Sequence, residues 1–186
     1  MTETIVITGA CYPPRLRERM GDEAPAMLSL LGHSNLLDQP MTALFGSARC
    51  PGSAILRAYD QAAHWRDTGR CVISGFHSPV EKECLRILLR GTSPVIVCPA
   101  RSLPKRIPPD WQTPLNEQRM LILSIFSAAE SRVTSSLAAR RNEFVAALAD
   151  EVWFAHIAEG GRMQDLHQKV RRMGIAAPVT PEPRKS

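Results

Sequence analysis

Long apolar runs are missing from this sequence of 186 residues. No stretch approaches the roughly eighteen uncharged apolar residues that a membrane-spanning helix needs, so we expect no membrane protein. The N-terminal residues, MTETIVITGA, hold an acidic residue and only a short apolar run, which does not predict a secretory signal. Aromatic residues make up only 5% of the chain, so few side chains can stack on bases.

Paired cysteines are missing as well. The five cysteines form no C-x-x-C pair, and an odd number without a signal sequence indicates reduced thiols in the cytoplasm. We expect most of them to be small, buried, hydrophobic residues. The sequence shows no HExxH motif, no Cys/His metal spacing and no recognisable Ser/His/Asp triad, so we expect no metal and no cofactor. The cysteines are Cys11, Cys50, Cys71, Cys84 and Cys98.

Charge and hydrophobicity describe an ordinary folded domain with a basic bias. The chain has 23 Lys and Arg against 18 Asp and Glu, and the net charge of +5 slightly favours polyanionic partners. Hydrophobic residues make up 44%, which is enough to bury a sizeable core. The length fits one domain rather than two.

Short apolar runs alternate with amphipathic stretches from residue 41 onward. The apolar runs predict strands over 41–47, 71–75, 93–100, 120–126 and 150–157. They are apolar throughout, as strands buried on both faces are. The stretches between them predict helices near 52–69, 78–90 and 131–149, with a last helix after Gly160-Gly161. The alternation predicts a single α/β domain with a doubly wound, mostly parallel sheet.

Three segments fall outside this alternation. Residues 1–40 are expected to form an irregular lead-in that packs on the core, with a short helical turn but no long regular element. Residues 99–114 contain five prolines and predict an irregular loop. The Pro-rich residues 174–186 predict a disordered tail. The domain itself is therefore expected to span residues 41–173.

The ligand crevice of a doubly wound sheet lies at the carboxyl ends of its strands. The first loop there begins Gly46-Ser47-Ala48-Arg49. Small residues let backbone amides approach an anion, the next helix N-terminus adds partial positive charge, and Arg49 can contact a phosphate. The same residues also suit a plain turn with a solvated Arg49. The loop matches neither a P-loop nor a GxGxxG fingerprint.

The second loop passes through Gly75 and His77 into a helix. Ser78 suits the N-cap of that helix, and Glu81 stands where a capping box requires an acidic residue. His77 can hydrogen-bond a ligand, or its polar atoms can be satisfied by the backbone. Glu81 and Glu83 are the candidates for acid–base catalysis, and a capping role for Glu81 and a surface role for Glu83 are the alternatives.

The third loop carries Arg101, with Lys105 and Arg106 behind it. A further cluster, Arg140-Arg141-Asn142, lies on the helix near 131–149. Together with Arg49 these cations can line a basic crevice that suits a nucleic-acid backbone or a phosphorylated ligand. The alternatives are charges dispersed over a solvated surface and a helix-capping role for Asn142.

Several motifs in this order resemble those of a known family. Tyr12-Pro13 is followed by Leu36-Leu37 and by an apolar run into Gly46-Ser47. The segment CVISG (71–75) and the segment RRNEFVAALAD (140–150) come later. These resemble the Tyr-Pro, Leu-Leu, Gly-Ser-Arg, Val-Val-Ser-Gly and Arg-Asn-Arg motifs of the DNA-processing protein DprA (Smf) family, from about residue 12 to about residue 172.

The chain also departs from that family pattern. Ala48 separates Gly-Ser from Arg49, and Glu143 replaces the second Arg of Arg-Asn-Arg. The family's Gly-x-Ala-x-Gly-Ile-Asp is replaced by residues 75–81, GFHSPVE, and its Glu in the last core strand by His156. The chain thus resembles a divergent, stand-alone member.

The resemblance implies a Rossmann-like fold and a protein without catalysis of its own. It implies that the protein binds single-stranded DNA in DNA uptake or recombination, delivers it to a RecA-type recombinase, and forms a dimer. The residues expected at the DNA are Gly46, Ser47, Arg49, Gly75, His77, Arg101, Arg140, Arg141 and Asn142.

Two other hypotheses use the same crevice. One is a nucleotide-binding protein or a nucleoside-monophosphate N-glycosidase, with His77, Glu81 and Glu83 as acid–base candidates. The "lonely guy" phosphoribohydrolases of the same superfamily carry a Gly-Gly-x-x-Thr hallmark that Gly160-Gly161 only half matches. The other is a sensor that binds a small nucleotide and changes its oligomeric state. A capping geometry for Glu81 would argue against catalysis.

Overall fold

The alternating apolar and amphipathic segments fold into strands and the helices that connect them. The computed structural model describes residues 4–9 and 12–178. The five predicted strands are confirmed as β3 (Met41–Phe45), β4 (Cys71–Ser74), β5 (Val95–Val97), β6 (Met120–Ser124) and β7 (Glu151–Phe154). The four predicted helices are confirmed as α2 (Gly52–Thr68), α3 (Pro79–Leu89), α5 (Ser135–Leu148) and α6 (Arg162–Arg172).

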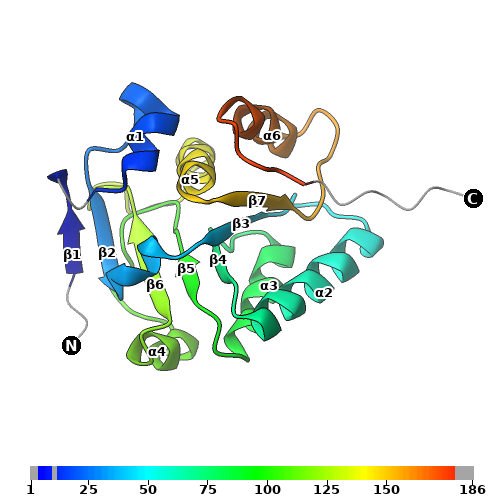
Figure 1. Ribbon diagram of the computed structural model, residues 1–186, viewed down its shortest axis with the longest axis horizontal. Helices are drawn as coiled ribbons and strands as arrows, with labels where there is room; N and C mark the ends of the chain where they lie inside the picture. Colours follow the sequence, from blue (N-terminus) through cyan, green and yellow to red (C-terminus); the bar gives the residue numbers. More distant parts are fainter. Residues whose placement is uncertain (1–3, 10–11, 179–186) are drawn as a thin grey trace, which may run out of the picture.

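The sheet has seven strands in the order β1-β2-β6-β5-β4-β3-β7 (Figure 1). The five predicted strands pair with one another only in parallel, which confirms the mostly parallel sheet. β3 pairs on one side with β4, the next strand in the chain, and on the other with β7, the last. The strand order therefore reverses at β3, and the crevice of such a sheet opens at this switch point.

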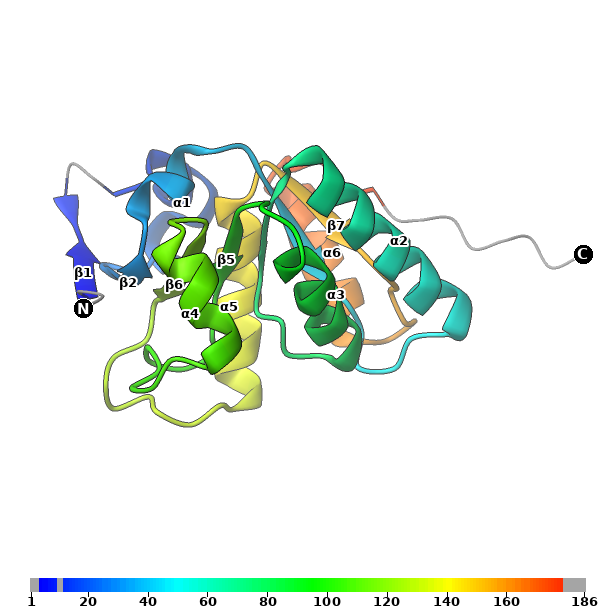
Figure 2. The same ribbon diagram turned by 90° about the horizontal axis from the view of Figure 1, so that it is seen from below.

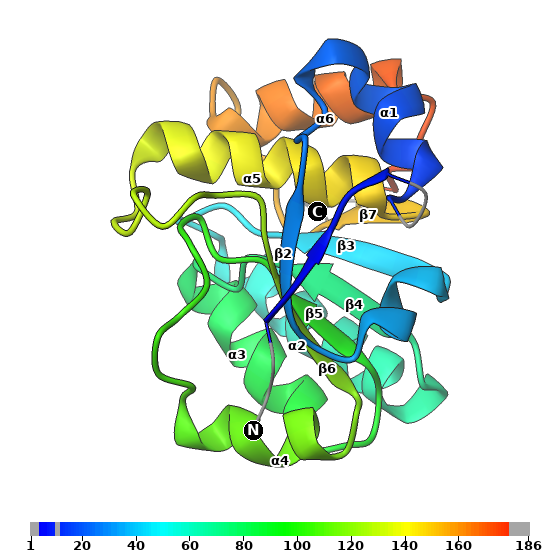
Figure 3. The ribbon, with the colours of Figure 1, turned by 90° about the vertical axis from the view of Figure 1, so that its left-hand side faces the viewer.

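Helices cover both faces of the sheet, which confirms the doubly wound fold. Figures 1 and 3 show α1, α5 and α6 on one face, and α2, α3 and α4 on the other. Each face has its own core, and β3 contributes to both: Ala43 and Phe45 pack toward α5, whereas Leu44 packs toward α2 and α3. Successive side chains of a strand point to opposite faces, so a strand buried on both must be apolar throughout.

The lead-in differs from the expectation for residues 1–40. It supplies β1 (Thr4–Ile7), α1 (Pro14–Met20) and β2 (Leu28–Gly32), and both strands join the sheet in antiparallel pairings. Leu28 and Leu30 are fully buried on one face of the sheet, with Ser29 between them. This period of two is a strand signal, but it covers only a few residues.

The loop expected over 99–114 is partly helical. Helix α4 (Pro109–Asn116) begins with Pro108 at the N-cap and Pro109 at the first helical position. Proline is well suited to that position, because its missing N–H has no helical partner there. The prolines that predicted a loop therefore mark a helix start.

The expected disordered tail is partly ordered. Ile175 is buried, and Ala176 accepts a hydrogen bond from the backbone N–H of Val152 on β7 at 2.8 Å. The chain thus covers the outer edge of β7 with its own backbone; residues 179–186 lie outside the described part. No helix in the described residues is long and apolar enough to cross a bilayer.

Candidate nucleic-acid interface

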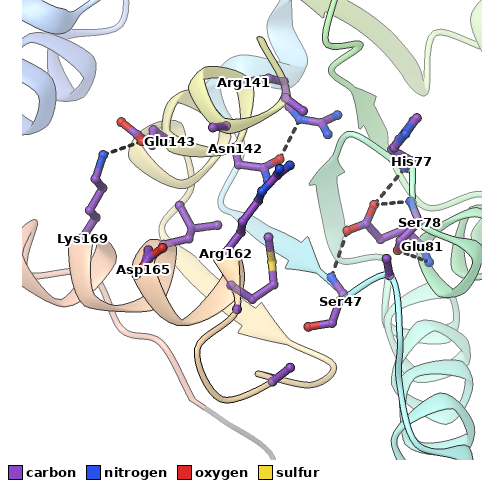
Figure 4. Close-up of a pocket in the computed structure, with 18 of the residues that line it drawn as sticks. Ser47, His77, Ser78, Glu81, Arg141, Asn142, Glu143, Arg162, Asp165 and Lys169 are labelled. Carbon is purple, nitrogen blue, oxygen red and sulfur yellow. Dashed lines mark hydrogen bonds and ion pairs between the residues drawn. The ribbon is translucent and has the colours of Figure 1, made fainter. Parts of the chain in front are cut away.

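A cavity of about 1000 Å³ opens where the strand order reverses. Its walls are the loop after β3, the loop after β4, one face of α5 and one face of α6 along its length (Figure 4). We call it the crevice. Ser47, Arg49, His77, Arg141 and Asn142 line it. The structure thus brings together residues from three predicted segments that are up to 95 positions apart in sequence, from 47 to 142.

Glu81 joins the two loops at the crevice floor. One carboxylate oxygen accepts hydrogen bonds from the backbone N–H groups of His77 and Ser78, at 2.8 and 3.1 Å. The other accepts from the N–H of Gly46 at 2.9 Å. The Ser78 hydroxyl accepts in return from the N–H of Glu81 at 3.3 Å, which completes the predicted capping box. We call this arrangement the Glu81 clasp.

The clasp changes the expected role of Gly46 and decides between the two roles considered for Glu81. The N–H of Gly46, which we expected to face a phosphate, donates to Glu81 instead. Glu81 itself is 6% exposed, and its carboxylate is held by three backbone donors. A carboxylate engaged in this way stabilises the loops and is poorly placed for acid–base chemistry.

Arg141 was expected at the DNA, but its guanidinium is buried beneath the loop after β4. Only 4% of the residue is exposed. Its Nη1 donates to the carbonyl of Cys98 at 2.7 Å and its Nε to the Asn142 side chain at 2.8 Å. Burial lowers the pKa of Arg141, and the nearby Glu81 carboxylate acts in the opposite direction. Arg141 is therefore a buried side chain whose hydrogen bonds support the crevice from below.

Gly75 leaves the space that this guanidinium fills. A Cβ atom on Gly75 would lie 1.2 Å from Nη1 of Arg141 and 1.8 Å from Cζ. Gly75 was expected to offer its backbone amide to a ligand. In the structure, its lack of a side chain leaves room for the Arg141 guanidinium. Gly46 is also confined, since a Cβ there would lie 2.4 Å from Val80.

Three predicted residues stand at the crevice with their side chains accessible. Arg49 and His77 are exposed, and Ser47 is half-buried with its hydroxyl bonded to the carbonyl of His156 at 3.0 Å. No described carboxylate forms an ion pair with Arg49. Arg49 is thus a cation free to meet an anion in the crevice.

Arg101, Arg140 and Glu83 lie outside the crevice. The Arg140 guanidinium lies 5.9 Å from the centre of the Phe126 ring, at the carboxyl end of β6. Arg101 is exposed on the loop after β5, and Glu83 pairs on the surface of α3 with Arg86 at 2.8 Å. Neither of the proposed catalytic carboxylates is therefore available in the crevice for proton transfer.

Arg101 belongs to a second basic group. It shares the loop after β5 with the exposed Lys105 and Arg106, and we call these three residues the basic loop. The Ser102 N–H donates to the carbonyl of Glu130 at 2.9 Å, which ties this loop to the one after β6. Figure 2 shows the loops after β3, β4, β5 and β6 along one side of the molecule, with the N-terminal end of α5 between the crevice loops and the basic loop.

The contribution of α6 was missed by sequence reasoning. Arg162, Lys169 and Arg172 line the crevice opposite Arg49, together with the apolar Met163 and Leu166. The signal was present as basic residues at helical spacing, but their direction depends on how α6 packs on α5. Among the described residues, no cluster of three His, Cys, Asp or Glu is placed to hold a metal ion.

Comparisons with known proteins found one matching sequence family and several similar folds. A sequence model of the family described as DNA recombination-mediator protein A matches residues 3–161. The structure resembles DNA processing protein A (DprA) from Streptococcus pneumoniae, with 19% identity, a TM-score of 0.78, and coverage of 98% of this chain and 64% of that one. No curated protein matches the sequence.

Two further structures are similar. One is DNA processing protein A from Helicobacter pylori, described for its single-stranded DNA binding mode, with 19% identity, a TM-score of 0.79, and coverage of 98% of this chain and 83% of that one. The other is a molybdenum cofactor binding protein from Rippkaea orientalis, with 11% identity, a TM-score of 0.56, and coverage of 76% of each chain. At these identities the likeness shows the fold alone.

Proposed function

The chain belongs to the DNA recombination-mediator protein A family, and on that premise we propose that it binds single-stranded DNA along the carboxyl edge of its sheet. The H. pylori relative is described as binding single-stranded DNA, which supports the same partner here. The strand passes from the crevice, past the N-terminal end of α5, to the basic loop. Its phosphates contact Arg49 at one end and Arg101, Lys105 and Arg106 at the other.

The main support for this proposal is the distance between the two basic groups, which are Arg49 in the crevice and the basic loop. They stand at the ends of β3 and β5, with β4 between them, and the basic loop reaches on to the end of β6. Neighbouring strands are about 4.8 Å apart, so the edge from β3 to β6 is about 14 Å long. A mononucleotide has its phosphate at one point, so it can contact either Arg49 or the basic loop. A DNA strand has a phosphate on every nucleotide, so it can contact both at once.

The enzyme hypothesis receives no such support. The Glu81 carboxylate is held by three backbone N–H groups, and Glu83 is paired with Arg86 away from the crevice. A glycosidase needs a carboxylate next to the bond that it breaks. The crevice is therefore better suited to holding an anion than to cleaving one.

The remaining parts of the proposal follow from the family. We propose that the protein works in the cytoplasm, acts as a dimer and passes the bound strand to a RecA-type recombinase during DNA uptake or recombination. The chain spans 64% of the S. pneumoniae protein, so parts of that activity can depend on segments outside the shared fold.

The test is the fluorescence anisotropy of a labelled single-stranded oligonucleotide, measured at several salt concentrations. Each phosphate contact contributes about 0.7 to the slope of log affinity against log salt for single strands. Arg49→Ala lowers that slope by about 0.7, and removing the three charges of the basic loop together lowers it further. The matched control is Arg90→Ala, an exposed arginine at the opposite end of α3 that should leave the slope unchanged.

Competition separates a DNA-binding protein from a nucleotide-binding one. Unlabelled oligonucleotide should displace the probe, and a mononucleotide at the same phosphate concentration should not. Failure to bind the oligonucleotide, or displacement by the mononucleotide, would reject the proposal.

A further inference from the structure

Helix α6 presents one charged face to the crevice. Arg162, Asp165, Lys169 and Arg172 follow each other at three- and four-residue intervals, and all four line the crevice. We call these residues the α6 stripe. The neighbouring Arg171 lies on another face of the helix, where it lines a separate small cavity with His167. Residues at this spacing share one side of a helix, so the stripe forms a continuous wall.

The facing wall on α5 has no accessible cation. Arg141 is buried and bonded to Cys98, and Asn142 is neutral. Glu143 carries a negative charge where the resemblance to the family places an arginine, and it accepts a hydrogen bond from Lys169 of the stripe. Figure 4 shows this pair bridging α5 and α6, with Arg162 projecting from α6 toward α5.

We propose that the α6 stripe is the phosphate-binding wall of the crevice and that Glu143 limits its strength. Arg162 and Arg172 contact the phosphates of a strand whose other side meets Arg49. Glu143 pairs with Lys169, so one of the three cations of the stripe is only partly available to the DNA. This inference rests on the proposed function, because it assigns residues to the same single-stranded DNA.

The exposure and pairing of these side chains support this division of roles. Arg162 and Arg172 are exposed, and no described carboxylate pairs with either of them. The Lys169 side chain is 47% exposed and that of Glu143 is 21% exposed. An ion pair open to water in this way is weak and readily exchanged. Asp165, the acidic member of the stripe, further reduces the attraction to a phosphate.

Four single substitutions test the inference with the salt-dependent anisotropy assay. Arg162→Ala and Arg172→Ala each remove one contact, so each should lower the salt slope by about 0.7. Arg171→Ala is the matched control, since it removes the same charge from the position next to Arg172, on another face of α6. Glu143→Gln releases Lys169 and should raise the slope by up to about 0.7. The affinity should rise about threefold at low salt, because one weak exposed ion pair no longer competes with the phosphate.

A gain of affinity in Glu143→Gln cannot result from misfolding, and circular dichroism of the three arginine variants checks that they fold. Equal losses in Arg171→Ala and Arg172→Ala would overturn the inference, and so would an unchanged affinity in Glu143→Gln. If Arg49→Ala weakens binding and the α6 variants do not, the proposed function stands, and the inference that the α6 stripe binds phosphates is rejected. If the unaltered protein binds no DNA, both fail together.

Discussion

Replacing Gly75 with alanine should destabilise the protein more than almost any other change of one methyl group. The new Cβ would lie 1.2 Å from Nη1, 1.8 Å from Cζ and 2.4 Å from Nη2 of Arg141. The new Cβ is fixed by the backbone, so the Arg141 side chain has to rotate away from Gly75 to relieve this overlap. The backbone of Gly75 does not have a positive φ, so the cost comes from the displaced guanidinium alone.

The size of the effect follows from what Arg141 loses. Its Nη1 donates to the Cys98 carbonyl at 2.7 Å in a site that leaves only 4% of the residue exposed. A hydrogen bond to a charged group contributes about 1.5–3 kcal/mol, and leaving a buried charge without its partner costs about 3–5 kcal/mol. We expect Gly75→Ala to lower the free energy of unfolding by about 3–5 kcal/mol.

Urea unfolding followed by circular dichroism measures this loss. With an m-value of about 2 kcal/mol/M, the midpoint should fall by roughly 2 M. Gly52→Ala is the matched control, because a Cβ at Gly52 meets no atom within 4 Å and the residue does not have a positive φ. That variant should unfold within about 1 kcal/mol of the unaltered protein.

A double-mutant cycle shows whether the guanidinium is the cause. In an Arg141→Ala background the obstructing atoms are gone, so Gly75→Ala should add little further destabilisation. The coupling between the two sites should be about 3 kcal/mol, at the upper end for residues in contact. The reasoning is refuted if Gly75→Ala costs the same in both backgrounds, or if it costs nothing in the unaltered protein.

Three further changes test other parts of the fold. Ser78→Ala removes the hydroxyl of the capping box and should cost about 1 kcal/mol in urea unfolding, whereas no loss would show that the hydrogen bonds to the Glu81 carboxylate alone hold the loop. Arg19→Ala removes hydrogen bonds of 2.8 and 2.6 Å to the carbonyls of Ala147 and Ala149 at the end of α5, and a cost of about 1–2 kcal/mol is expected by the same assay. Burial raises the pKa of three thiols from 9.0 to about 12, so their contribution to stability is complete below pH 9 and is lost as the pH rises from 9 toward 12. A thiol reagent at pH 8 should therefore label these three only after urea unfolds the protein, and labelling of the native protein would contradict their burial. The three are Cys71, Cys84 and Cys98.

Local patterns predicted the central sheet because its strands are buried on both faces. An apolar run such as residues 120–126 predicts a strand wherever it lies in the chain, and the capping box at Ser78 depends only on residues three positions apart. Strands β1 and β2 escaped prediction because they precede the alternation of apolar and amphipathic segments that marks the other five, and because Ser29 interrupts the apolar residues of β2. Helix α4 escaped because proline disfavours most of a helix but favours its first position.

The site was predicted less well, because side-chain direction depends on contacts between distant segments. The loop after β3 was placed correctly at the crevice with Arg49. Arg141 was expected to line the crevice and contact the DNA. It does line the crevice, but it is buried there, and this burial depends on Gly75 and on the carbonyl of Cys98, 43 positions away. The charges of α6 were overlooked because a helical pattern shows which residues share a face but not which element that face meets.

The position of β3 between β4 and β7 also sets the order in which the protein can be completed during translation. The N–H of Met41 bonds to Asp150, 109 positions later in the chain. A ribosome adds about 5–20 residues per second, so this partner is made roughly 5–20 s after Met41. The loop after β3 and the Glu81 clasp can form early, from residues close in sequence. Helix α6, which lines the crevice opposite the loop after β3, is made last, so the crevice cannot close before residues 162–172 have been synthesised.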